Sequence, residues 1–429
     1  MVNNVNSILK EVLLEIKPSE KEMKEIEGIL KDYLQKVKTN LKKKKINADI
    51  FVGGSFAKKT MMKRDLYDID IFIRFDKKYK NELLSDITEK VLSGVGTRAT
   101  RIHGSRDYFN IKVKENLLFE IVPVKKISKP GEAENVTDLS YSHVNYIRKK
   151  IKSEKILDEI RLAKAFCHAN GAYGAESYIN GFSGYGLELL VYHHKSFLKF
   201  LKSIIKVNKD KPVIDLEKHH KSKSRILMDL NEAKLKSPIV LVDPTYKQRN
   251  VLAALSEETF RNFQNVCKEF LRKPRREFFI PKTANIEKIR QDAKKRGLDF
   301  VAIEIKTEKQ EGDIAGSKLL KFYKHLIVEA GKFFEIKEKG FEYIGKQTGI
   351  AFIVGKKKPF ILIMGPEVHD KENSSRFRAK HRTISIKNGR VYAKETIQKD
   401  FTGFLEQCKV KNIFKIREMG INGLEFNFK

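Results

Sequence analysis

The stretch from Asp49 to Phe75 constrains the fold of this chain more than any other part of the sequence. Its pattern predicts a short apolar strand, a glycine-rich turn at residues 53–55, a short helix, and a second strand at residues 66–75. Because successive side chains of a strand point to opposite faces, Asp68 and Asp70 are predicted to share one face. Isoleucines alternate with them, so the strand is expected to pack on a core and to present two carboxylates on its other side.

The two carboxylates predict a cation site. Like charges on neighbouring positions of one face repel each other, and a divalent cation is the simplest group that neutralises both. Oxygen-only ligands suit magnesium. The Gly54-Ser55 turn ahead of a helix can supply backbone N–H groups to phosphate oxygens, so the unit predicts phosphoryl or nucleotidyl transfer. Each part alone is also compatible with an ordinary turn or a solvated strand edge, but the combination favours the functional interpretation.

A third carboxylate is expected on a neighbouring strand, since a two-metal site needs ligands that converge from separate segments. Residues 109–113 and 117–124 predict a hairpin, and Glu120 is the lone acid in its second arm. An acid in an apolar strand is costly to bury unless it faces a metal or an arginine. From the residues alone, an ordinary edge-strand glutamate is an equally good interpretation.

The spacing of Gly54-Ser55, Asp68-Ile69-Asp70 and Glu120 resembles the signature of the nucleotidyltransferase superfamily that includes DNA polymerase beta. Segments within residues 161–190 and 242–253 narrow the likeness to the archaeal (class I) CCA-adding enzymes. Members of that family build and repair the 3′ end of tRNA without a nucleic-acid template. The likeness extends over most of the chain.

The resemblance implies roles for individual side chains. Asp68, Asp70 and Glu120 are expected to hold two Mg²⁺ ions and to be the catalytic residues. Nucleotide binding is expected at Gly54, Ser55, Lys58, His143, Lys164, Tyr173 and Arg249. Without the resemblance, His143, Lys164 and Tyr173 would be interpreted as a capping histidine, a surface lysine and a packed tyrosine. The family likeness assigns Arg249 to reading the edge of the base. Without the likeness, Arg249 would be interpreted as a salt-bridged surface residue.

The chain departs from the family pattern at some of these positions. The family normally has Asp where this chain has Glu120, and often has Glu where it has Asp68. The carboxylate count is preserved, although the lengths differ. Lys58 stands where Arg is usual, which keeps the charge and loses the bidentate fork.

The implied activity is magnesium-dependent addition of C, C and A from CTP and ATP to tRNA. In that reaction the tRNA 3′-hydroxyl attacks the α-phosphorus in line and pyrophosphate leaves. Three alternatives stay open: a poly(A) polymerase-like nucleotidyltransferase, a partial enzyme that adds only A or only C, and a non-catalytic tRNA-binding protein. A homodimer is one possibility for the oligomeric state.

The charge of the chain fits a polyanionic partner. Lys and Arg number 87 against 55 acids, which gives a formal net charge of +32. A membrane surface or a Lys-rich genome is an alternative explanation. No apolar run is long enough to span a bilayer and the N-terminus lacks a signal-peptide pattern, so no membrane association and a cytoplasmic location are predicted.

The cysteines and adjacent histidines predict no zinc site. Cys167, Cys267 and Cys408 are far apart and odd in number, so reduced thiols are expected. His219-His220 cannot easily face one metal from a strand, which favours a solvated or RNA-facing loop.

The expected fold class is α+β with several domains. The predicted divisions are a nucleotidyltransferase head of mixed sheet and covering helices at residues 1–145, a helical neck that recognises the base at residues 146–258, a tRNA-binding body at residues 259–312 and 385–429, and a tRNA-binding tail at residues 313–384. A basic, proline-containing linker is predicted at residues 274–282.

Local signals predict several element boundaries. Ser19 and Glu22 have the spacing of a capping box, and Asn388-Gly389 is typical of a type I′ turn. A helix is predicted from Arg249 to Leu255. Residues 350–354 and 360–364 are predicted to form a hairpin.

Overall fold

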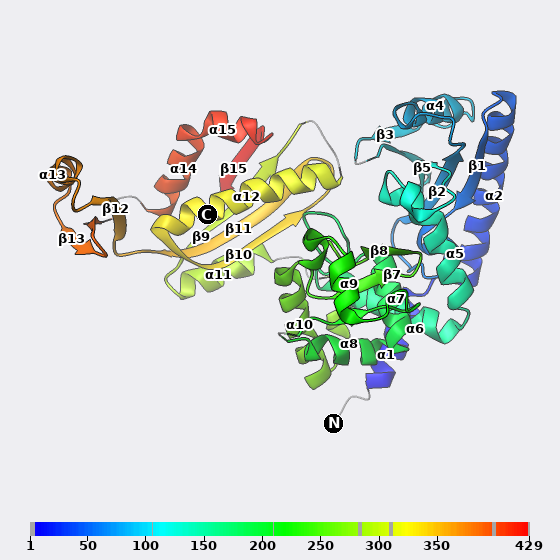
Figure 1. Ribbon diagram of the computed structural model, residues 1–429, viewed down its shortest axis with the longest axis horizontal. Helices are drawn as coiled ribbons and strands as arrows, with labels where there is room; N and C mark the ends of the chain where they lie inside the picture. The colour runs from blue at the N-terminus through cyan, green and yellow to red at the C-terminus, as the bar shows by residue number, and fades with distance from the viewer. Residues whose placement is uncertain are drawn as a thin grey trace. The chain divides into compact units, whose positions relative to one another are not determined.

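The computed structural model describes residues 5–104, 106–208, 210–281, 285–308, 312–396 and 400–427. They form two compact units, Met1–Lys282 and Thr283–Lys429. Both units contain helices and strands (Figure 1), which confirms the α+β multidomain prediction. The predicted linker at residues 274–282 ends at the boundary between the units, and its last residue lies outside the described residues. None of the helices in the described ranges combines the length and apolar character that a membrane span requires.

Five strands form the sheet of the first unit, in the order β1-β2-β5-β4-β3 (Figure 1). Their bounds are β1 Ala48–Val52, β2 Tyr67–Phe75, β3 Thr100–Ile102, β4 Tyr108–Lys114 and β5 Leu117–Lys125. Strands β2 and β5 are parallel, and the other neighbours are antiparallel. The predicted strand at residues 66–75 therefore lies directly beside the second arm of the predicted hairpin.

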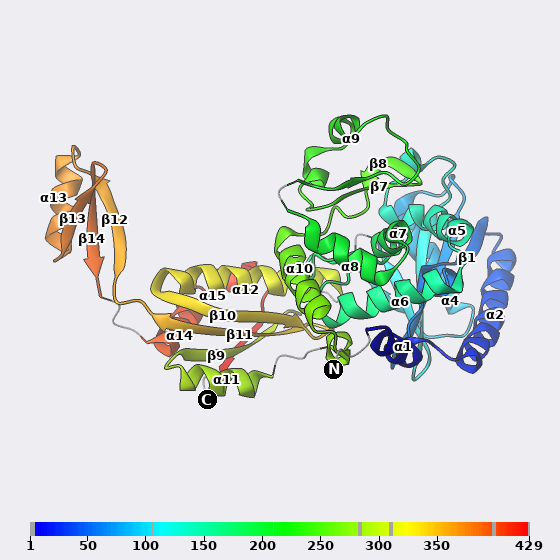
Figure 2. The ribbon, with the colours of Figure 1, turned by 90° about the horizontal axis from the view of Figure 1, so that it is seen from below.

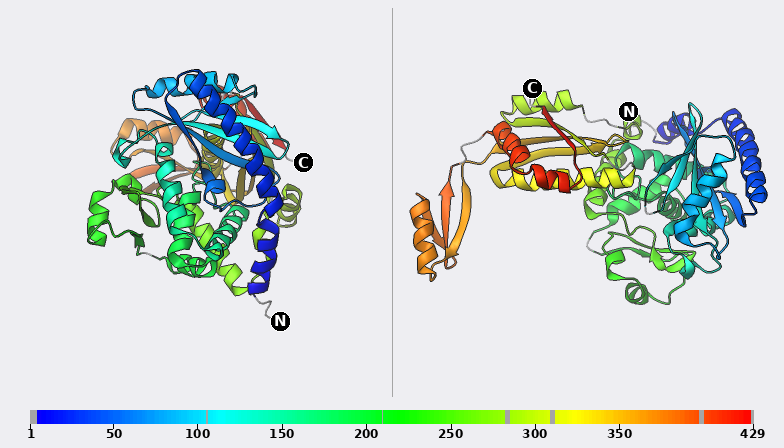
Figure 3. Two further views of the ribbon diagram at one scale, coloured as in Figure 1. Left: turned by 90° about the vertical axis from the view of Figure 1, so that its right-hand side faces the viewer. Right: turned by 90° about the horizontal axis from the view of Figure 1, so that it is seen from above.

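One face of this sheet is covered by two helices, α2 (Glu20–Lys43) and α4 (Asn81–Ser93) (Figures 1 and 3). The predicted capping box starts α2: the Ser19 side chain accepts from Glu22 N, and the Glu22 side chain accepts from Ser19 N. The alternating isoleucines of β2 are fully buried in this core. Burial of each isoleucine side chain stabilises the fold by about 1.5–3 kcal/mol relative to exposure. This determines which face of β2 packs on the core and leaves Asp68 and Asp70 on the opposite face.

A second core of the first unit is helical (Figure 2). It involves α1 (Val5–Ile16), α5 (Ser140–Lys150), α6 (Glu154–Ala169), α7 (Gly184–His194), α8 (Phe197–Lys206) and α10 (Glu257–Arg272). Phenylalanine rings pack at its centre; those of Phe166 and Phe270 lie 5.2 Å apart, centroid to centroid. Helix α6 ends at Ala169 with Asn170 as its C-cap, and Gly171 follows in the left-handed conformation with φ +64°. These helices carry Lys164 and surround the site described below.

A small three-stranded sheet joins this helical part. Its strands are β6 (Val213–Ile214), β7 (Val240–Asp243) and β8 (Tyr246–Asn250), and α9 (Lys223–Asp229) packs nearby (Figure 2). The predicted helix from Arg249 to Leu255 is wrong, because Arg249 lies in β8. The Asn250 side chain accepts from Leu241 N, and Val251 N donates to Leu241 O. The chain is thus held to β7, and this tertiary pairing overrides the helical spacing of its apolar residues.

The second unit contains a four-stranded antiparallel sheet in the order β10-β11-β9-β15. These strands are β9 (Asp299–Lys306), β10 (Phe334–Tyr343), β11 (Thr348–Lys357) and β15 (Gly423–Asn427). Helices α12 (Asp313–Phe333), α14 (Phe401–Lys411) and α15 (Ile413–Glu418) share one core with the sheet, and α11 (Ile286–Lys295) packs on the other face (Figure 2).

A second sheet of this unit, in the order β12-β14-β13, corrects the predicted hairpin. It consists of β12 (Ile361–Glu367), β13 (Ile384–Lys387) and β14 (Arg390–Glu395), with α13 (Lys371–Lys380) against it. Residues 350–354 and 360–364 do not pair, because β11 has both edges occupied by β10 and β9 while β12 pairs with β14. The β13–β14 turn is as predicted, with Asn388 and Gly389 at φ 48° and 72°.

Candidate active site

The register of β2 and β5 brings two of the predicted carboxylates side by side. Asp70 lies opposite Glu120 in this parallel pair, which confirms that the third acid is on the neighbouring strand. Asp68 lies two residues earlier on the same face, is exposed, and is opposite Leu118. Neighbouring strands are about 4.8 Å apart, so the carboxylates of Asp70 and Glu120 project into one small volume.

The glycine turn approaches the carboxylates closely. Gly53 N donates to Asp70 O at 2.8 Å. Gly54 has φ +58°, and a Cβ atom there would lie 1.6 Å from Asp70 Oδ2. Only glycine satisfies both the backbone conformation and the contact. Ser55 follows in the short helix α3 (Gly54–Ala57), so the predicted phosphate-binding turn is adjacent to the acids.

Burial and neighbouring negative charge raise the pKa of two of the acids. Burial and the charge of Asp68 raise the pKa of Asp70 to about 6. Burial and the charges of Asp70 and Asp68 raise the pKa of Glu120 to about 8. Full ionisation of the cluster at neutral pH is therefore unfavourable unless a cation compensates the charge.

The chemistry of these side chains fits a hard divalent cation. All three acids offer oxygen donors, as magnesium prefers. Asn110 lies opposite Glu120 on β4, and its Oδ1 is buried without a hydrogen-bond partner, so a fourth oxygen is available beside the pair. Within the described ranges, no three or more His, Cys, Asp or Glu side chains are grouped closely enough to hold a metal as they stand. Asp68, Asp70 and Glu120 would hold the ion.

A buried ionic cluster adjoins the carboxylates. Glu188, fully buried on α7, accepts from Lys164 Nζ at 2.7 Å, from Lys58 Nζ at 2.8 Å and from Thr60 Oγ1 at 2.8 Å. Burial alone would raise the pKa of Glu188, but the charges of Lys164 and Lys58 lower it to about 2. The charges of Lys58 and Lys164 also act on Asp70, where they oppose the rise in its pKa. The cluster therefore lies within electrostatic reach of the acids.

A second buried acid, Asp243 at the end of β7, binds two of the residues predicted to contact the nucleotide, His143 and Arg249. Its Oδ2 accepts from His143 Nε2 at 2.9 Å and from Arg249 Nη1 at 2.8 Å. Its Oδ1 accepts from Thr245 N and Oγ1, both at 2.8 Å, and from Tyr185 OH at 3.3 Å. Burial would raise the pKa of Asp243, yet these hydrogen bonds and the neighbouring positive charges hold it well below its usual range.

His143 is held beside Tyr185. The two rings stack with centroids 4.0 Å apart. Burial, assisted by the charges of Arg249 and Lys58, lowers the pKa of His143 although Asp243 opposes the shift. Because Lys58 acts on both His143 and Asp70, it connects the base-side residues to the carboxylates.

Tyr173 is positioned by the loop between α6 and α7. It forms an isolated bridge with Phe182, and a Cβ atom on Gly184 would lie 2.9 Å from the Tyr173 hydroxyl. Burial raises the pKa of Tyr173, and the charge of Glu188 adds to the effect. The tyrosine thus lies near the ionic cluster.

Two residues of this arrangement escape the sequence prediction: Glu188 and Asp243 receive no role from it. Both are acids in apolar segments, the same signal that identifies Glu120. Glu188 lies among Leu187, Leu189 and Leu190, so its burial could have been expected, whereas its lysine partners could not. The partners are 24 and 130 residues away in sequence.

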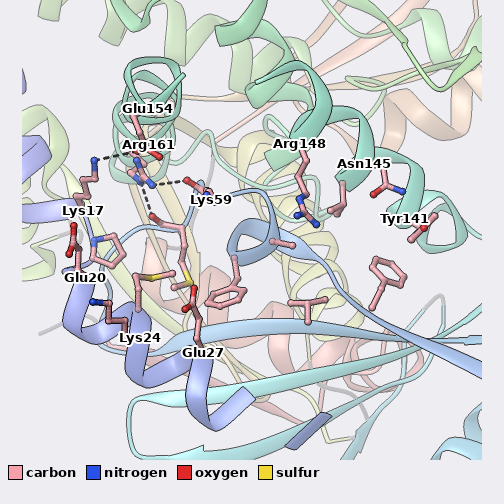
Figure 4. A pocket seen from close by; sticks show the side chains of 18 residues that line it. Lys17, Glu20, Lys24, Glu27, Lys59, Tyr141, Asn145, Arg148, Glu154 and Arg161 are labelled. Carbon is pink, nitrogen blue, oxygen red and sulfur yellow. Dashed lines mark hydrogen bonds and ion pairs between the residues drawn. The ribbon is translucent and has the colours of Figure 1, made fainter. Parts of the chain in front are cut away.

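A separate pocket of about 940 Å³ lies between α2, β1, α3, α5 and α6 (Figure 4). Figure 4 shows Lys17 paired with Glu154 and Arg161 bonded to Lys59 on one wall, with Arg148 and Tyr141 on the other. None of the predicted site residues lines it. The pocket is therefore distinct from the carboxylate face.

The contact at Gly54 predicts a position-specific effect of alanine. Gly54→Ala should cost more than the roughly 1–2 kcal/mol of a left-handed alanine, because the new Cβ also displaces Asp70. We expect a lowered melting temperature and loss of most activity. Gly28→Ala in α2 is the control; nothing lies within 4 Å of its Cβ, and alanine there should stabilise the helix by about 0.5–1 kcal/mol. Equal melting temperatures and activities of the two variants would contradict the assigned contact.

Comparison with known proteins agrees with this arrangement. The family described as a nucleotidyltransferase domain matches residues 34–158, and the second domain of tRNA nucleotidyltransferase matches residues 158–280. The chain is 42% identical over 188 residues to a CCA-adding enzyme of Nanoarchaeum equitans, covering 44% of this chain and 47% of that enzyme. It is 29% identical over 411 residues to a CCA-adding enzyme of Methanocaldococcus jannaschii, covering 92% of this chain and 88% of that enzyme.

A solved structure shares the fold of about two thirds of the chain. The Cid1 poly(U) polymerase structure superimposes with a TM-score of 0.51 at 13% identity, covering 65% of this chain and 99% of that one. At this identity the likeness concerns the fold alone. The two matching domain families and the relative that spans most of the sequence make this chain similar to the archaeal CCA-adding enzymes, which are tRNA nucleotidyltransferases.

Proposed function

We propose that this chain adds and repairs the 3′-terminal CCA of tRNA, using CTP and ATP and no nucleic-acid template. The observation that carries the proposal is the pairing of Asp70 with Glu120 on adjacent parallel strands, beside an ionic cluster with two lysines. The relatives named CCA-adding enzymes favour tRNA as the acceptor. The net charge of +32 suits such a polyanion.

The carboxylates have the chemistry for the phosphoryl site. A divalent metal, for which we propose Mg²⁺, would supply positive charge to the attacking and leaving oxygens when bound by Asp68, Asp70 and Glu120. Binding of the ion would relieve the electrostatic repulsion between the buried carboxylates of Asp70 and Glu120, and this relief would favour metal binding.

The other side chains hold the nucleotide. Gly54 and Ser55 border the carboxylates and offer backbone N–H groups, while Lys58 provides ammonium donors and Lys164 provides positive charge to the triphosphate. Arg249 is fixed by Asp243 through one guanidinium N–H, so its remaining donors can face a base edge. His143 and Tyr173 complete the proposed nucleotide pocket.

The assignment of domains extends the proposal to the rest of the chain. We propose that residues 1–145 form the catalytic head, residues 146–258 the neck that carries Arg249, and the remaining body and tail the tRNA-binding parts. The described elements of the second unit are two sheets and their helices. Truncation after residue 281 is a direct way to ask whether tRNA affinity depends on that unit.

Incorporation assays test the function. With tRNA that lacks its terminal CCA, CTP alone should extend the acceptor by two residues, ATP alone should not extend it efficiently, and both together should restore CCA. Long tails made from ATP alone would point to a poly(A) polymerase. Addition of only C or only A with both nucleotides present would point to a partial enzyme.

Affinity for tRNA should fall steeply with salt. Each phosphate that Lys or Arg neutralises releases condensed counterions, so about five such contacts predict a log–log slope of about −4. Fluorescence titration across a series of potassium chloride concentrations gives the slope. A shallow slope would mean that the Lys-rich composition does not reflect phosphate contacts.

A further inference from the structure

Glu188 is the centre of a buried ionic cluster whose purpose a stability argument does not explain. Both of its carboxylate oxygens are engaged: Oε1 accepts from Lys164 Nζ and Thr60 Oγ1, and Oε2 accepts from Lys58 Nζ. Its neighbours Leu187 and Leu189 are fully buried, so the pair with Lys164 is shielded from solvent. Buried ion pairs are often no more stabilising than apolar residues of the same volume. Retention of this cluster therefore calls for another role.

The geometry of the cluster fixes two amines from different segments. Lys58 follows the short helix α3, Lys164 lies on α6, and Glu188 lies on α7. Lys164 Nζ is tied by Glu188 at 2.7 Å, by Thr60 Oγ1 at 2.8 Å and by Thr60 O at 3.5 Å. Thr60 Oγ1 also donates to Glu188 at 2.8 Å. A single carboxylate thus determines where both ammonium groups lie.

The two amines lie within electrostatic reach of the carboxylates. The charges of both lysines act on Asp70, and the charge of Lys58 also acts on His143. Lys58 is the less buried of the two, with 10% of its side chain exposed against 2% for Lys164. With two ammonium groups and one carboxylate, the cluster keeps a net positive charge, which suits an anionic ligand.

We infer that Glu188 is a positioning residue for the triphosphate of the incoming nucleotide. Glu188 holds Lys58 and Lys164 in place, and the Lys58 N–H groups that do not bond Glu188 then point at the β- and γ-phosphates. Because the ammonium groups are already in position, nucleotide binding has no reorganisation cost. In the part of the chain that the structure describes, Glu188 is the hydrogen-bond partner of Lys58 Nζ. This inference rests on the proposed function and assigns a role to a residue that touches neither metal nor substrate.

The direction of the change in CTP affinity in Glu188→Gln distinguishes a positioning role from a simple effect of charge. Loss of a negative charge near a triphosphate should strengthen binding if only Coulomb attraction matters. Positioning predicts the opposite: Glu188→Gln should weaken CTP binding about 10- to 100-fold, the usual worth of hydrogen bonds to charged groups. The loss for CMP, which lacks the β- and γ-phosphates, should be smaller. Isothermal titration calorimetry of the full chain with CTP and with CMP, in Mg²⁺ and without tRNA, measures both.

A second pair of variants covers the case in which Glu188→Gln does not fold, since it leaves buried ammonium groups without their carboxylate. Lys164→Met alone keeps the contact between Lys58 and Glu188. Combining it with Glu188→Gln removes that contact and also removes both charges of the buried Lys164–Glu188 pair. The double variant should bind CTP about ten-fold more weakly than Lys164→Met alone, because only in the double variant is Lys58 released. Circular dichroism and the melting temperature establish folding.

Glu217→Gln is the matched control. Glu217 also accepts from a lysine and a hydroxyl, those of Lys150 and Tyr146, but it does not contact the cluster. It should bind CTP as the wild type does. Equal or tighter CTP binding by Glu188→Gln, or equal binding by the double variant and Lys164→Met, would overturn the positioning role. These binding results stand independently of tRNA extension, so a wild-type chain that binds CTP and adds nothing to tRNA would refute the proposed function instead.

Discussion

Replacement of Asp70 by Asn is expected to reduce CMP and AMP incorporation about a thousand-fold or more, with little change in tRNA affinity. Asp70 faces Glu120 across two adjacent strands and is the acid nearest the glycine turn, so the neutral amide removes the central ligand of the proposed metal site. Metal binding and phosphate-backbone contact are separate tasks, so tRNA affinity should change little. Incorporation assays beside gel-shift titrations measure the two effects separately.

The direction of the stability change in Asp70→Asn follows from the pKa of Asp70. The folded-state pKa of Asp70 is raised to about 6, so ionisation in the folded chain costs stability as pH rises through the interval between its usual value and about 6. Without added metal, Asp70→Asn should therefore be at least as stable as the wild type at pH 7. Asp32→Asn, at an exposed position of α2, is the matched control and should retain activity. Normal incorporation by the Asp70 variant would refute the metal assignment.

Arg249→Lys is expected to lose discrimination between CTP and UTP by about 1–3 kcal/mol, the usual worth of a bidentate base contact. Cytosine and adenine share an acceptor nitrogen beside an exocyclic amine, whereas uracil and guanine present N–H at that place. A guanidinium aimed at this edge would leave a donor facing a donor with the wrong bases. The hydrogen bond from Arg249 Nη1 to Asp243 Oδ2, at 2.8 Å, fixes the orientation of the guanidinium. A lysine would keep the charge but not the planar fork of donors.

The measurement is the efficiency of CTP and UTP incorporation into tRNA that lacks its CCA. Arg225→Lys, on α9 of the same unit and paired with Asp229, is the matched control and should leave the preference intact. A variant at Arg249 that slows both nucleotides equally would assign this residue to structure or to RNA-backbone contact. Base selection would then lie elsewhere.

The face that carries Asp68 and Asp70 is predictable because its signals are local. Side-chain alternation in β2 has a period of two, so the facing of Asp68 and Asp70 follows from the isoleucines between them. The Ser19 capping box and the Asn388-Gly389 turn are likewise determined by residues within a few positions of each other. Such signals need no knowledge of tertiary contacts.

The partners of the buried acids were not predictable for the opposite reason. Glu188 binds Lys58 from 130 residues away, and Asp243 binds His143 from 100 residues away. Arg249 was assigned to a helix because the apolar spacing after it is helical, yet the Asn250 side chain holds the strand to β7. Contacts of this range depend on how the sheet and helices pack, which no periodicity in the sequence encodes.

The most direct test of the central claim is to sequence the products made from a mixture of all four nucleoside triphosphates. The acceptors are tRNAs that end at the discriminator base, after the first C, and after the second C. The predicted result is that each is completed to CCA, with no U or G incorporated and no further extension of tRNA that already ends in CCA. Homopolymeric tails, incorporation that follows nucleotide concentration, or continued growth beyond CCA would contradict the account.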